Sequence, residues 1–236
     1  MKIIVLSINQ YKEKDAVITA ISQSETITFL ARGIKDPKSK NTAINNPLMI
    51  ADIDLMEGDF KYPILKSSKE ILTPMKLKTD SAYLGTLLLM NEMMLHFFPD
   101  EEKAKMFAYL EEGVTSLKKT DNWLMTLLIF MARAMSIGGF ELEVNRCVIC
   151  GKKNRIVAFS FVEGGFICEE CANEETERDL TKDQMLLLRA IFNSRDYHLV
   201  ESSFNKEDAL VLLDKFIAFS EEAFGYHLKN TRLILD

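Results

Sequence analysis

Four cysteines are the residues of this sequence whose type and spacing point most directly to chemistry. They form two C-x2-C pairs with seventeen residues between the inner two, and they are the only cysteines in the chain: Cys147, Cys150, Cys168 and Cys171. This spacing is typical of a four-thiolate zinc site, because thiolates three positions apart on a tight turn can take adjacent corners of a tetrahedron. The sequence therefore predicts one structural zinc ion. Two disulfides, an iron site of similar spacing and four buried thiols stay open as alternatives.

A β-hairpin is expected to bring the two cysteine pairs together. Residues 154–161 are β-prone, Gly164 and Gly165 favour a turn, and the chain then returns to Cys168. The predicted zinc hairpin, residues 145–175, is too small to have an apolar core of its own. Metal binding would therefore supply its folding energy. With four sulfurs bound the site has no open position, so its predicted role is structural and not catalytic.

Composition and charge limit the class of protein. The chain has 236 residues, of which 47% are hydrophobic and 27% charged, as in ordinary globular proteins. Its net charge of −6 argues against a generally basic nucleic-acid binder. The acidity belongs to the later part of the chain, since residues 1–75 hold ten basic and nine acidic residues and the remainder holds 19 and 26. No signal peptide or membrane span is predicted, so we expect a cytoplasmic protein with reduced thiols.

The first part of the chain is rich in β signals. Five short strands are predicted at 3–8, 16–21, 26–31, 48–55 and 62–67. So many short strands in so few residues favour a small closed barrel or sandwich, and an OB-fold barrel has five strands.

The pattern becomes helical near Pro74. Helices are predicted at 81–98, 101–118, 122–137, 185–192 and 206–224. Each is preceded by a residue suited to capping: Asp80, Asp100, Asp121 or Asn122, Thr181 with Gln184 as a capping box, and Asn205. The predicted fold class is therefore α+β multidomain. An OB-fold β-barrel in residues 1–75 precedes an all-α helical domain in residues 76–236, and the four-cysteine zinc hairpin is inserted in that helical domain.

Basic residues gather in two turns of the predicted barrel. One lies between the first two strands, and the other is a loop after the third strand that contains Gly33 and Pro37. Turns at one end of a small barrel can line a groove that follows a phosphate backbone. The predicted DNA contacts are Lys12, Arg32, Lys35, Lys38 and Lys40. Tyr11 could stack on a base beside them, although lysine-rich loops are also common as plain solvated surface.

An enzyme is not predicted. The three histidines, His96, His198 and His227, belong to no recognisable nucleophile motif. There is also no glycine-rich phosphate loop, so ATP use is not indicated.

Several segments resemble the RecO family of bacterial recombination mediators. Ala31–Lys40 resembles the family's A-[RK]-G-x-[RK]-x-P-x-S-[RK] segment. Gly139–Gly151 and Phe159–Cys171 resemble its cysteine hairpin, and Phe224–Leu233 resembles its G-x-x-L-K-S-x-[RK]-x-L tail. The resemblance covers essentially the whole chain, and the cysteine hairpin is its most specific part.

The resemblance implies a function as well as a fold. It implies binding to single- and double-stranded DNA and annealing of complementary strands. It also implies action with RecR to load RecA onto DNA coated by single-strand binding protein. Family members bind the acidic, Phe-terminated tail of that protein through the helical domain. Arg133 beside Phe130 is the expected receiving site here, with the alternative that Arg133 covers the core and pairs with a nearby glutamate.

Two other classes of function remain open. A zinc-stabilised adaptor would bind a protein partner through the β domain and would not bind DNA. A zinc-dependent nucleic-acid enzyme would need an open metal position and a general base, and the four-sulfur pattern offers neither. The preferred hypothesis is a non-enzymatic mediator, cytoplasmic and nucleoid-associated.

Overall fold

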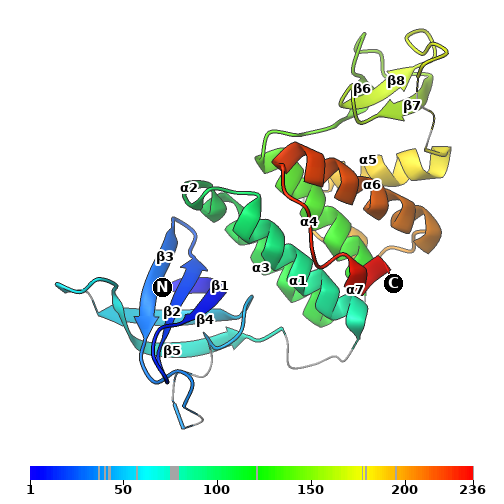
Figure 1. Ribbon diagram of the computed structural model, residues 1–236. Coiled ribbons are helices and arrows are strands. Elements are labelled where there is room, and N and C mark those ends of the chain that lie inside the picture. Colours follow the sequence, from blue (N-terminus) through cyan, green and yellow to red (C-terminus); the bar gives the residue numbers. More distant parts are fainter. Residues whose placement is uncertain are drawn as a thin grey trace. The chain divides into compact units, whose positions relative to one another are not determined.

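In the computed structural model, the chain forms a β-barrel followed by helices and a small second sheet (Figure 1). The structure describes residues 1–36, 38–39, 41, 44–56, 58–74, 80–120, 122–176, 178, 180–194 and 196–235. Two compact units form, one from Met1–Asp121 with Lys229–Asp236 and the other from Asn122–Leu228. The first unit is therefore built from both ends of the chain.

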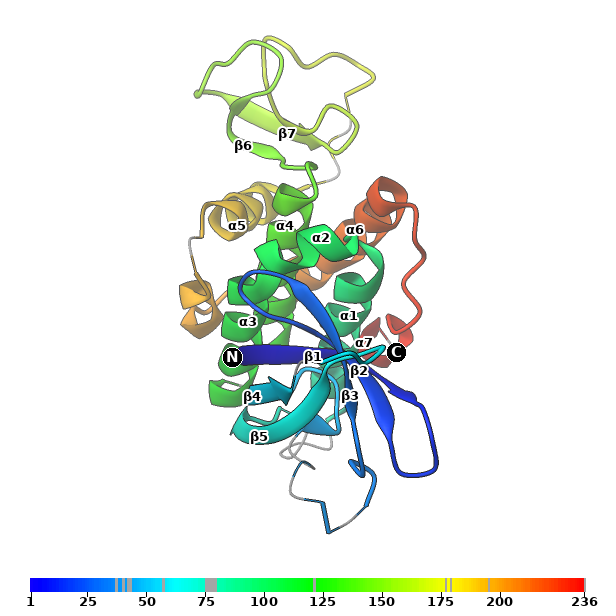
Figure 2. The ribbon, with the colours of Figure 1, turned by 90° about the vertical axis from the view of Figure 1, so that its left-hand side faces the viewer.

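Five strands of the first unit close into a barrel. Their bounds are β1 Lys2–Gln10, β2 Ala16–Ile21, β3 Thr26–Ala31, β4 Ile50–Met56 and β5 Ile64–Leu72. They are ordered β1-β2-β3-β5-β4, and β1 pairs with β4 to complete the circle (Figure 2). β3 and β5 are parallel, with Leu30 opposite Ile64, and the other neighbours are antiparallel. This is a five-stranded OB-fold barrel, as the sequence predicted.

Alternating apolar residues fill the barrel. Ile3, Val5, Ile18, Ala20 and Phe29 are fully buried together in its core. Successive side chains of a strand point to opposite faces, so this spacing of two places each of them inside. The predicted bounds of β2 and β3 are confirmed.

The fourth strand begins later than predicted, because Leu48 has a φ of 60° and cannot continue an extended strand. The fifth strand also differs, starting at Ile64 and running on to Leu72.

Helices complete the first unit. Their bounds are α1 Ser81–His96, α2 Asp100–Lys103, a 3-10 turn Ala104–Met106, α3 Phe107–Lys119 and α7 Arg232–Leu235. Asp80 caps α1 as predicted, its carboxylate accepting from the N–H of Ala82 at 3.0 Å. The single helix predicted at 101–118 is wrong, because the 3-10 turn interrupts it. Asp100 is also not a cap: it is the first helical residue and accepts from Lys103 Nζ, whose side chain is buried.

The C-terminal segment, Lys229–Leu235, packs against α1. Glu92 of α1 is only 6% exposed, and its carboxylate accepts from the Lys229 N–H at 2.8 Å. The same carboxylate accepts from the backbone N–H of Asn230 at 3.2 Å and from its Nδ2 at 2.7 Å. Further along, Gly85 admits the segment closely, since a Cβ there would lie 2.7 Å from Ile234 Cγ1. One carboxylate therefore holds the turn that leads into α7.

The second unit consists of three main helices and a three-stranded sheet. The bounds are α4 Trp123–Ile137, β6 Glu143–Cys147, β7 Ile156–Ser160, β8 Gly165–Cys168, α5 Lys182–Asn193, a 3-10 turn His198–Glu201 and α6 Lys206–Phe224. The helices pack on one another, and the sheet has the order β6-β8-β7 (Figures 1 and 2). The hairpin of β7 and β8 was predicted. β6, which runs parallel to β8, was not.

Local signals begin and end these helices. The Asn122 side chain accepts from the N–H of Met125, and Asn205 caps α6 by accepting from the N–H of Glu207. Both bonds of the predicted capping box between Thr181 and Gln184 are present. Among the described helices, none combines the length and apolar character needed to cross a bilayer.

Candidate metal centre and nucleic-acid interface

The four cysteine sulfurs converge in the second unit. All four Sγ atoms lie within 4.8 Å of one another, and Cys150 and Cys168 are 3.6 Å apart. A tetrahedral zinc ion with Zn–S bonds of about 2.3 Å needs sulfurs about 3.8 Å apart, so the cluster fits one such ion after small adjustments. All four are free thiols, which removes the two-disulfide alternative.

Two tight turns position these sulfurs. In the first, the Cys147 carbonyl accepts from the Gly151 N–H at 2.8 Å, and Gly151 takes a positive φ of 77° that favours glycine. In the second, the Cys168 carbonyl accepts from the N–H of Cys171 at 3.0 Å. Cys147 ends β6 and Cys168 ends β8, so the sheet brings the two turns together.

The sulfurs also perturb one another electrostatically. Burial raises the pKa of Cys147, but hydrogen bonds from the backbone near Cys150 and Cys168 outweigh it and bring the pKa to about 6. Hydrogen bonding to Cys150, followed by burial, raises the pKa of Cys171 to about 12. The Cys147 sulfur is thus stabilised as a thiolate, while the Cys171 sulfur keeps its proton. A bound cation would remove the remaining protons, because the thiolate is the metal ligand.

Ion pairs surround the cysteine turns. Lys152 pairs with Glu170, and Arg155 Nη1 lies 3.6 Å from Glu169 Oε2. All four side chains are exposed. The two glutamates next to Cys168 and Cys171 are therefore surface charges.

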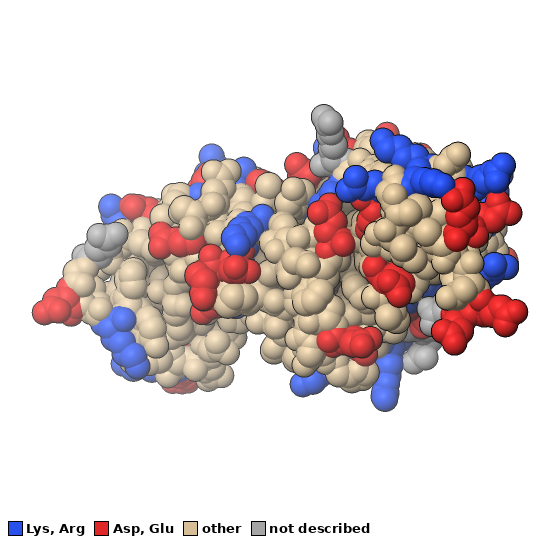
Figure 3. Space-filling view, turned by 90° about the horizontal axis from the view of Figure 1, so that it is seen from above, with Lys and Arg blue, Asp and Glu red and all other residues tan. Residues whose placement is uncertain are grey.

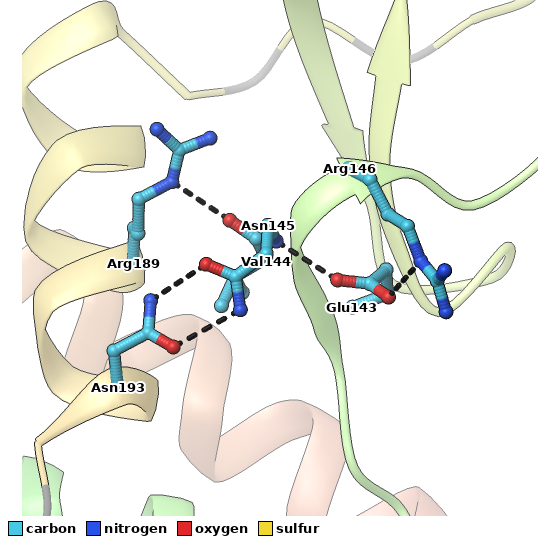
Figure 4. A network of polar contacts seen from close by, with 6 residues as sticks. All are labelled: Glu143, Val144, Asn145, Arg146, Arg189 and Asn193. Carbon is cyan, nitrogen blue, oxygen red and sulfur yellow. Dashed lines mark hydrogen bonds and ion pairs between the residues drawn. The ribbon is translucent and has the colours of Figure 1, made fainter. Parts of the chain in front are cut away.

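A polar network fastens the sheet to α5 (Figure 4). Arg189 Nε donates to the Val144 carbonyl at 2.8 Å. Asn145 and Asn193 each donate a side-chain amide to the other's carbonyl oxygen, at 3.0 and 2.8 Å. Figure 4 shows Arg189 and Asn193 facing β6 from the same side of α5. Since β6 carries Cys147, the helix helps to fix one wall of the sulfur cluster.

In the first unit, two loops meet at one end of the barrel. The β1–β2 turn and the loop after β3 are joined by the Lys35 N–H, which donates to the Lys14 carbonyl at 3.2 Å. Asp15 adds a second link by accepting from the Gly33 N–H at 2.8 Å. Gly33 has a φ of 61°, which a side-chain-bearing residue adopts only with strain. These two hydrogen bonds hold the loop after β3 against the β1–β2 turn.

The structure brings most of the predicted DNA-binding residues to this end of the barrel. Lys12 lies in the turn, and Arg32, Lys35 and Lys38 follow β3; all four are exposed. Lys35 Nζ donates a hydrogen bond to Gln10 Oε1 at 3.2 Å. Because this amide oxygen is neutral, the bond does not neutralise the positive charge of Lys35. Lys40 lies outside the described residues.

Asp36 is the acidic member of this group, and no role was predicted for it. It accepts from Lys14 Nζ at 3.0 Å and from the Lys38 N–H at 3.0 Å. The backbone hydrogen bond from Lys38, followed by Lys14, lowers its pKa. Lys14 lies 22 residues before Asp36 in the chain, so no local sequence pattern shows this pairing.

Aromatic side chains lie near the same loops. Tyr11, in the β1–β2 turn, is 49% exposed, and Lys12 Nζ is 5.7 Å from its ring centroid. Phe60, in the β4–β5 loop, is also 49% exposed. That loop adjoins the end of β3, because the Leu30 N–H donates to the Pro63 carbonyl. Phe29, by contrast, is buried in the barrel core.

The residues expected to receive an acidic tail lie on α4. Phe130 is fully buried, so its ring offers no surface to a ligand. Arg133 is half-buried, and its charge is among the influences that lower the pKa of Asp196, the largest being the hydrogen bond from the His198 backbone. This environment resembles the alternative in which Arg133 lies along the core close to an acidic residue.

Charges of both signs lie side by side on the face of the molecule shown in Figure 3. This agrees with the moderate net charge of −6. Binding to phosphates would therefore depend on local groups such as the one at the barrel end.

Comparisons with known proteins agree with the sequence motifs. Residues 78–229 match the family described as Recombination protein O C terminal. The chain is 26% identical over 236 residues to the DNA repair protein RecO of Bacillus subtilis, which covers 98% of this chain and 91% of that protein. It is 22% identical over 234 residues to that of Halalkalibacterium halodurans, with coverage of 98% and 92%. A third relative, from Streptococcus pneumoniae, is 24% identical over 201 residues, with coverage of 84% and 78%.

Proposed function

Because the chain belongs to the RecO family and so has a role in DNA repair by recombination, we propose that it is a mediator that binds single- and double-stranded DNA and anneals complementary strands. With RecR, it helps to load RecA onto single-stranded DNA that is coated by single-strand binding protein. Annealing makes and breaks no covalent bond, so this function needs no catalytic residue. It needs neutralised phosphates and accessible bases.

The observation that carries the proposal is the joined pair of loops at the barrel end. Exposed Lys12, Arg32, Lys35 and Lys38 form a basic group there, and exposed Tyr11 lies beside it. Cations of this kind bind the phosphate backbone and release counterions, while an exposed ring can stack on any base. Both contacts are independent of sequence, as a protein that anneals arbitrary strands requires.

The metal that best suits the cysteine cluster is zinc. Four thiolates within tetrahedral reach are typical of structural zinc sites, and such a site leaves no position for a substrate or a catalytic water. Within the described part of the chain, this is the one group of three or more potential metal ligands at coordination distance. We assign the ion the role of stabilising the β6-β8-β7 sheet.

The protein acts in the cytoplasm, where the nucleoid lies. The tail of single-strand binding protein binds its helical part, and Arg133 is the candidate for its carboxylates.

Salt-dependent binding to single-stranded DNA tests the proposal. The double variant Lys35→Glu with Lys38→Glu should weaken binding by roughly tenfold or more at low salt. It should also flatten the slope of log affinity against log salt by about 0.7 for each phosphate that is no longer neutralised. The variant should leave the thermal unfolding unchanged, because both side chains are exposed.

A matched control is available in the same unit. Lys118 and Lys119 are exposed at the end of α3, and reversing both charges changes the net charge equally. Equally weakened binding in the two double variants would show that only total charge matters and would refute the loop assignment. Wild-type protein that binds no DNA, alone or with RecR, would favour the adaptor function instead.

A further inference from the structure

The four sulfurs of the cysteine cluster differ in their exposure to solvent. Cys150 is exposed and Cys171 is half-buried, whereas Cys147 and Cys168 are each 1% exposed. The turn that carries Cys150 is itself poorly covered, since the aliphatic side chain of its neighbour Ile149 is 55% exposed. A small solute can therefore reach the Cys150 sulfur most directly.

A buried sulfur lies next to this exposed one. Cys168 Sγ is 3.6 Å from Cys150 Sγ, and the two cysteines lie 18 residues apart in the chain, on different turns. Cys168 is the last residue of β8, so the sheet fixes its position. Because a disulfide holds its sulfurs at about 2.05 Å, a shift of about 1.5 Å would join this pair.

The cluster also favours oxidation for a chemical reason. A metal ligand of this type is a thiolate, and the thiolate is the form of cysteine that oxidants attack. Susceptibility to oxidation follows thiolate character and exposure. Four sulfurs that hold one ion share the first property and differ in the second, which singles out Cys150.

We propose that Cys150 is an oxidation site at which a hydroperoxide, such as hydrogen peroxide, converts the metal centre into a disulfide with Cys168 and so releases the metal. This inference rests on the assignment of zinc to the cluster. It adds a reversible, peroxide-sensitive state to a site whose assigned role is to stabilise the sheet.

The reaction has two steps and uses one hydrogen peroxide molecule. In the first step, Cys150 Sγ attacks one peroxide oxygen: an S–O bond forms, the O–O bond breaks and hydroxide leaves, so that the sulfur becomes a sulfenic acid. In the second step, Cys168 Sγ attacks the Cys150 sulfur: the S–S bond forms, the S–O bond breaks and a second hydroxide leaves. The two sulfurs lose two electrons to the peroxide, and two protons from solvent convert both hydroxides into water.

The disulfide removes two of the four metal ligands. Cys147 and Cys171 alone are too few for a structural zinc site. The sheet should stay attached to α5, because the hydrogen bond between Arg189 and the Val144 carbonyl involves no cysteine (Figure 4). The change is therefore confined to the two cysteine turns, and reduction of the disulfide in the presence of zinc should reverse it.

Peroxide treatment of the full-length, zinc-loaded protein tests the proposal. A colour-forming zinc indicator measures release, and mass spectrometry of peptides maps the sulfurs after the remaining thiols have been alkylated. We expect release of about one zinc ion per chain, a Cys150–Cys168 disulfide, and alkylation of Cys147 and Cys171. When dimedone is present to trap sulfenic acids, the first adduct should form on Cys150. Dithiothreitol with added zinc should restore the bound metal.

Histidine variants separate the roles of the sulfurs. Three cysteines with one histidine are also a common structural zinc set, so each variant should still hold the ion. Cys150→His should release zinc several-fold more slowly than the wild type, because the exposed sulfur is gone. Cys171→His is the matched control and should release zinc as fast as the wild type. Cys168→His should accumulate the dimedone adduct of Cys150 and form no disulfide between the two turns.

The zinc content is measured before peroxide is added, so that two kinds of failure can be told apart. Purified wild-type protein without zinc would refute the zinc assignment, and this inference with it. Zinc that stays bound at a peroxide dose that fully oxidises free glutathione would refute this inference alone. A first dimedone adduct on any cysteine other than Cys150 would do the same, as would equal protection by Cys150→His and Cys171→His. If a histidine variant holds no zinc, the order of adducts in the wild type decides.

Discussion

Lys14 Nζ lies 3.0 Å from Asp36 Oδ2, so the acidic residue of the loop after β3 is paired with a lysine of the β1–β2 turn. The pair joins the two halves of the proposed DNA interface. It also places a negative charge among the residues expected to meet phosphates.

Replacing Asp36 should strengthen DNA binding. Asp36→Asn removes a carboxylate that repels phosphate and leaves Lys14 available for contact, so affinity for single-stranded DNA should rise several-fold at low salt. The hydrogen bond from the Lys38 backbone, followed by Lys14, holds the pKa of Asp36 below its usual 3.8. The carboxylate is therefore ionised throughout pH 5 to 8, and we expect the same gain across that range.

Asp36 also affects the stability of the folded state, and this effect depends on pH. Because the pKa of Asp36 is lowered by folding, its pairing stabilises the folded state above pH 3.8, and that contribution is lost as the pH falls below this value.

Fluorescence anisotropy at two pH values measures the effect of Asp36→Asn on DNA binding. Weaker binding by Asp36→Asn would show that the carboxylate orders the loop and that this matters more than its charge.

Removing one sulfur should release the metal. Cys150→Ser leaves three thiolates, and we expect metal analysis to fall from about one zinc ion per chain to a small fraction. The melting temperature should fall as well, because metal binding supplies folding energy to the sheet. Ile149→Ser is the control, since Ile149 is an exposed neighbour in the same turn. Iron in place of zinc in the purified wild-type protein would refute the assignment of zinc.

Glu92 should be important for stability. Glu92→Ala removes the acceptor of three hydrogen bonds to the C-terminal segment, and we expect a loss of about 2 kcal/mol in the free energy of unfolding. Urea denaturation measures this loss, with Glu222→Ala as an exposed control on α6. A loss no larger than that of the control would mean that water replaces the carboxylate.

Gly85 tests the same segment sterically. In Gly85→Ala the new Cβ would lie 2.7 Å from Ile234 Cγ1 and 2.9 Å from Leu233 Cβ, so the segment must shift. We expect the free energy of unfolding to fall by about 1–3 kcal/mol. The double variant with Glu92→Ala should lose less than the sum of the two, because both changes displace one segment. Additive effects would indicate that the two positions act independently.

The sequence predicted those parts of the structure that depend on local signals. The strands 16–21 and 26–31 and the caps at Asp80, Thr181 and Asn205 are confirmed. The convergence of the four cysteines is also confirmed, because two tight turns and a hairpin determine it.

Other features depend on partners distant in the chain. β6 is short and contains polar Asn145 and Arg146, and it becomes a strand by pairing with β8. The interruption between α2 and α3 accompanies burial of Lys103, which no periodicity indicates. The contact of α5 with the sheet, through Arg189 and the Val144 carbonyl, likewise depends on a sheet whose position the sequence does not specify.

The packing of the C-terminal segment on α1 has a consequence for synthesis on the ribosome. Domains usually fold in order as they emerge, the N-terminal one first. Here the first unit includes Lys229–Asp236, so α1 lacks its partner until these residues have been made. The barrel can form early, but Glu92 and Gly85 meet the C-terminal segment only after the second unit has been synthesised. A nascent chain stalled before residue 229 would therefore expose this face of α1 to chaperones and proteases.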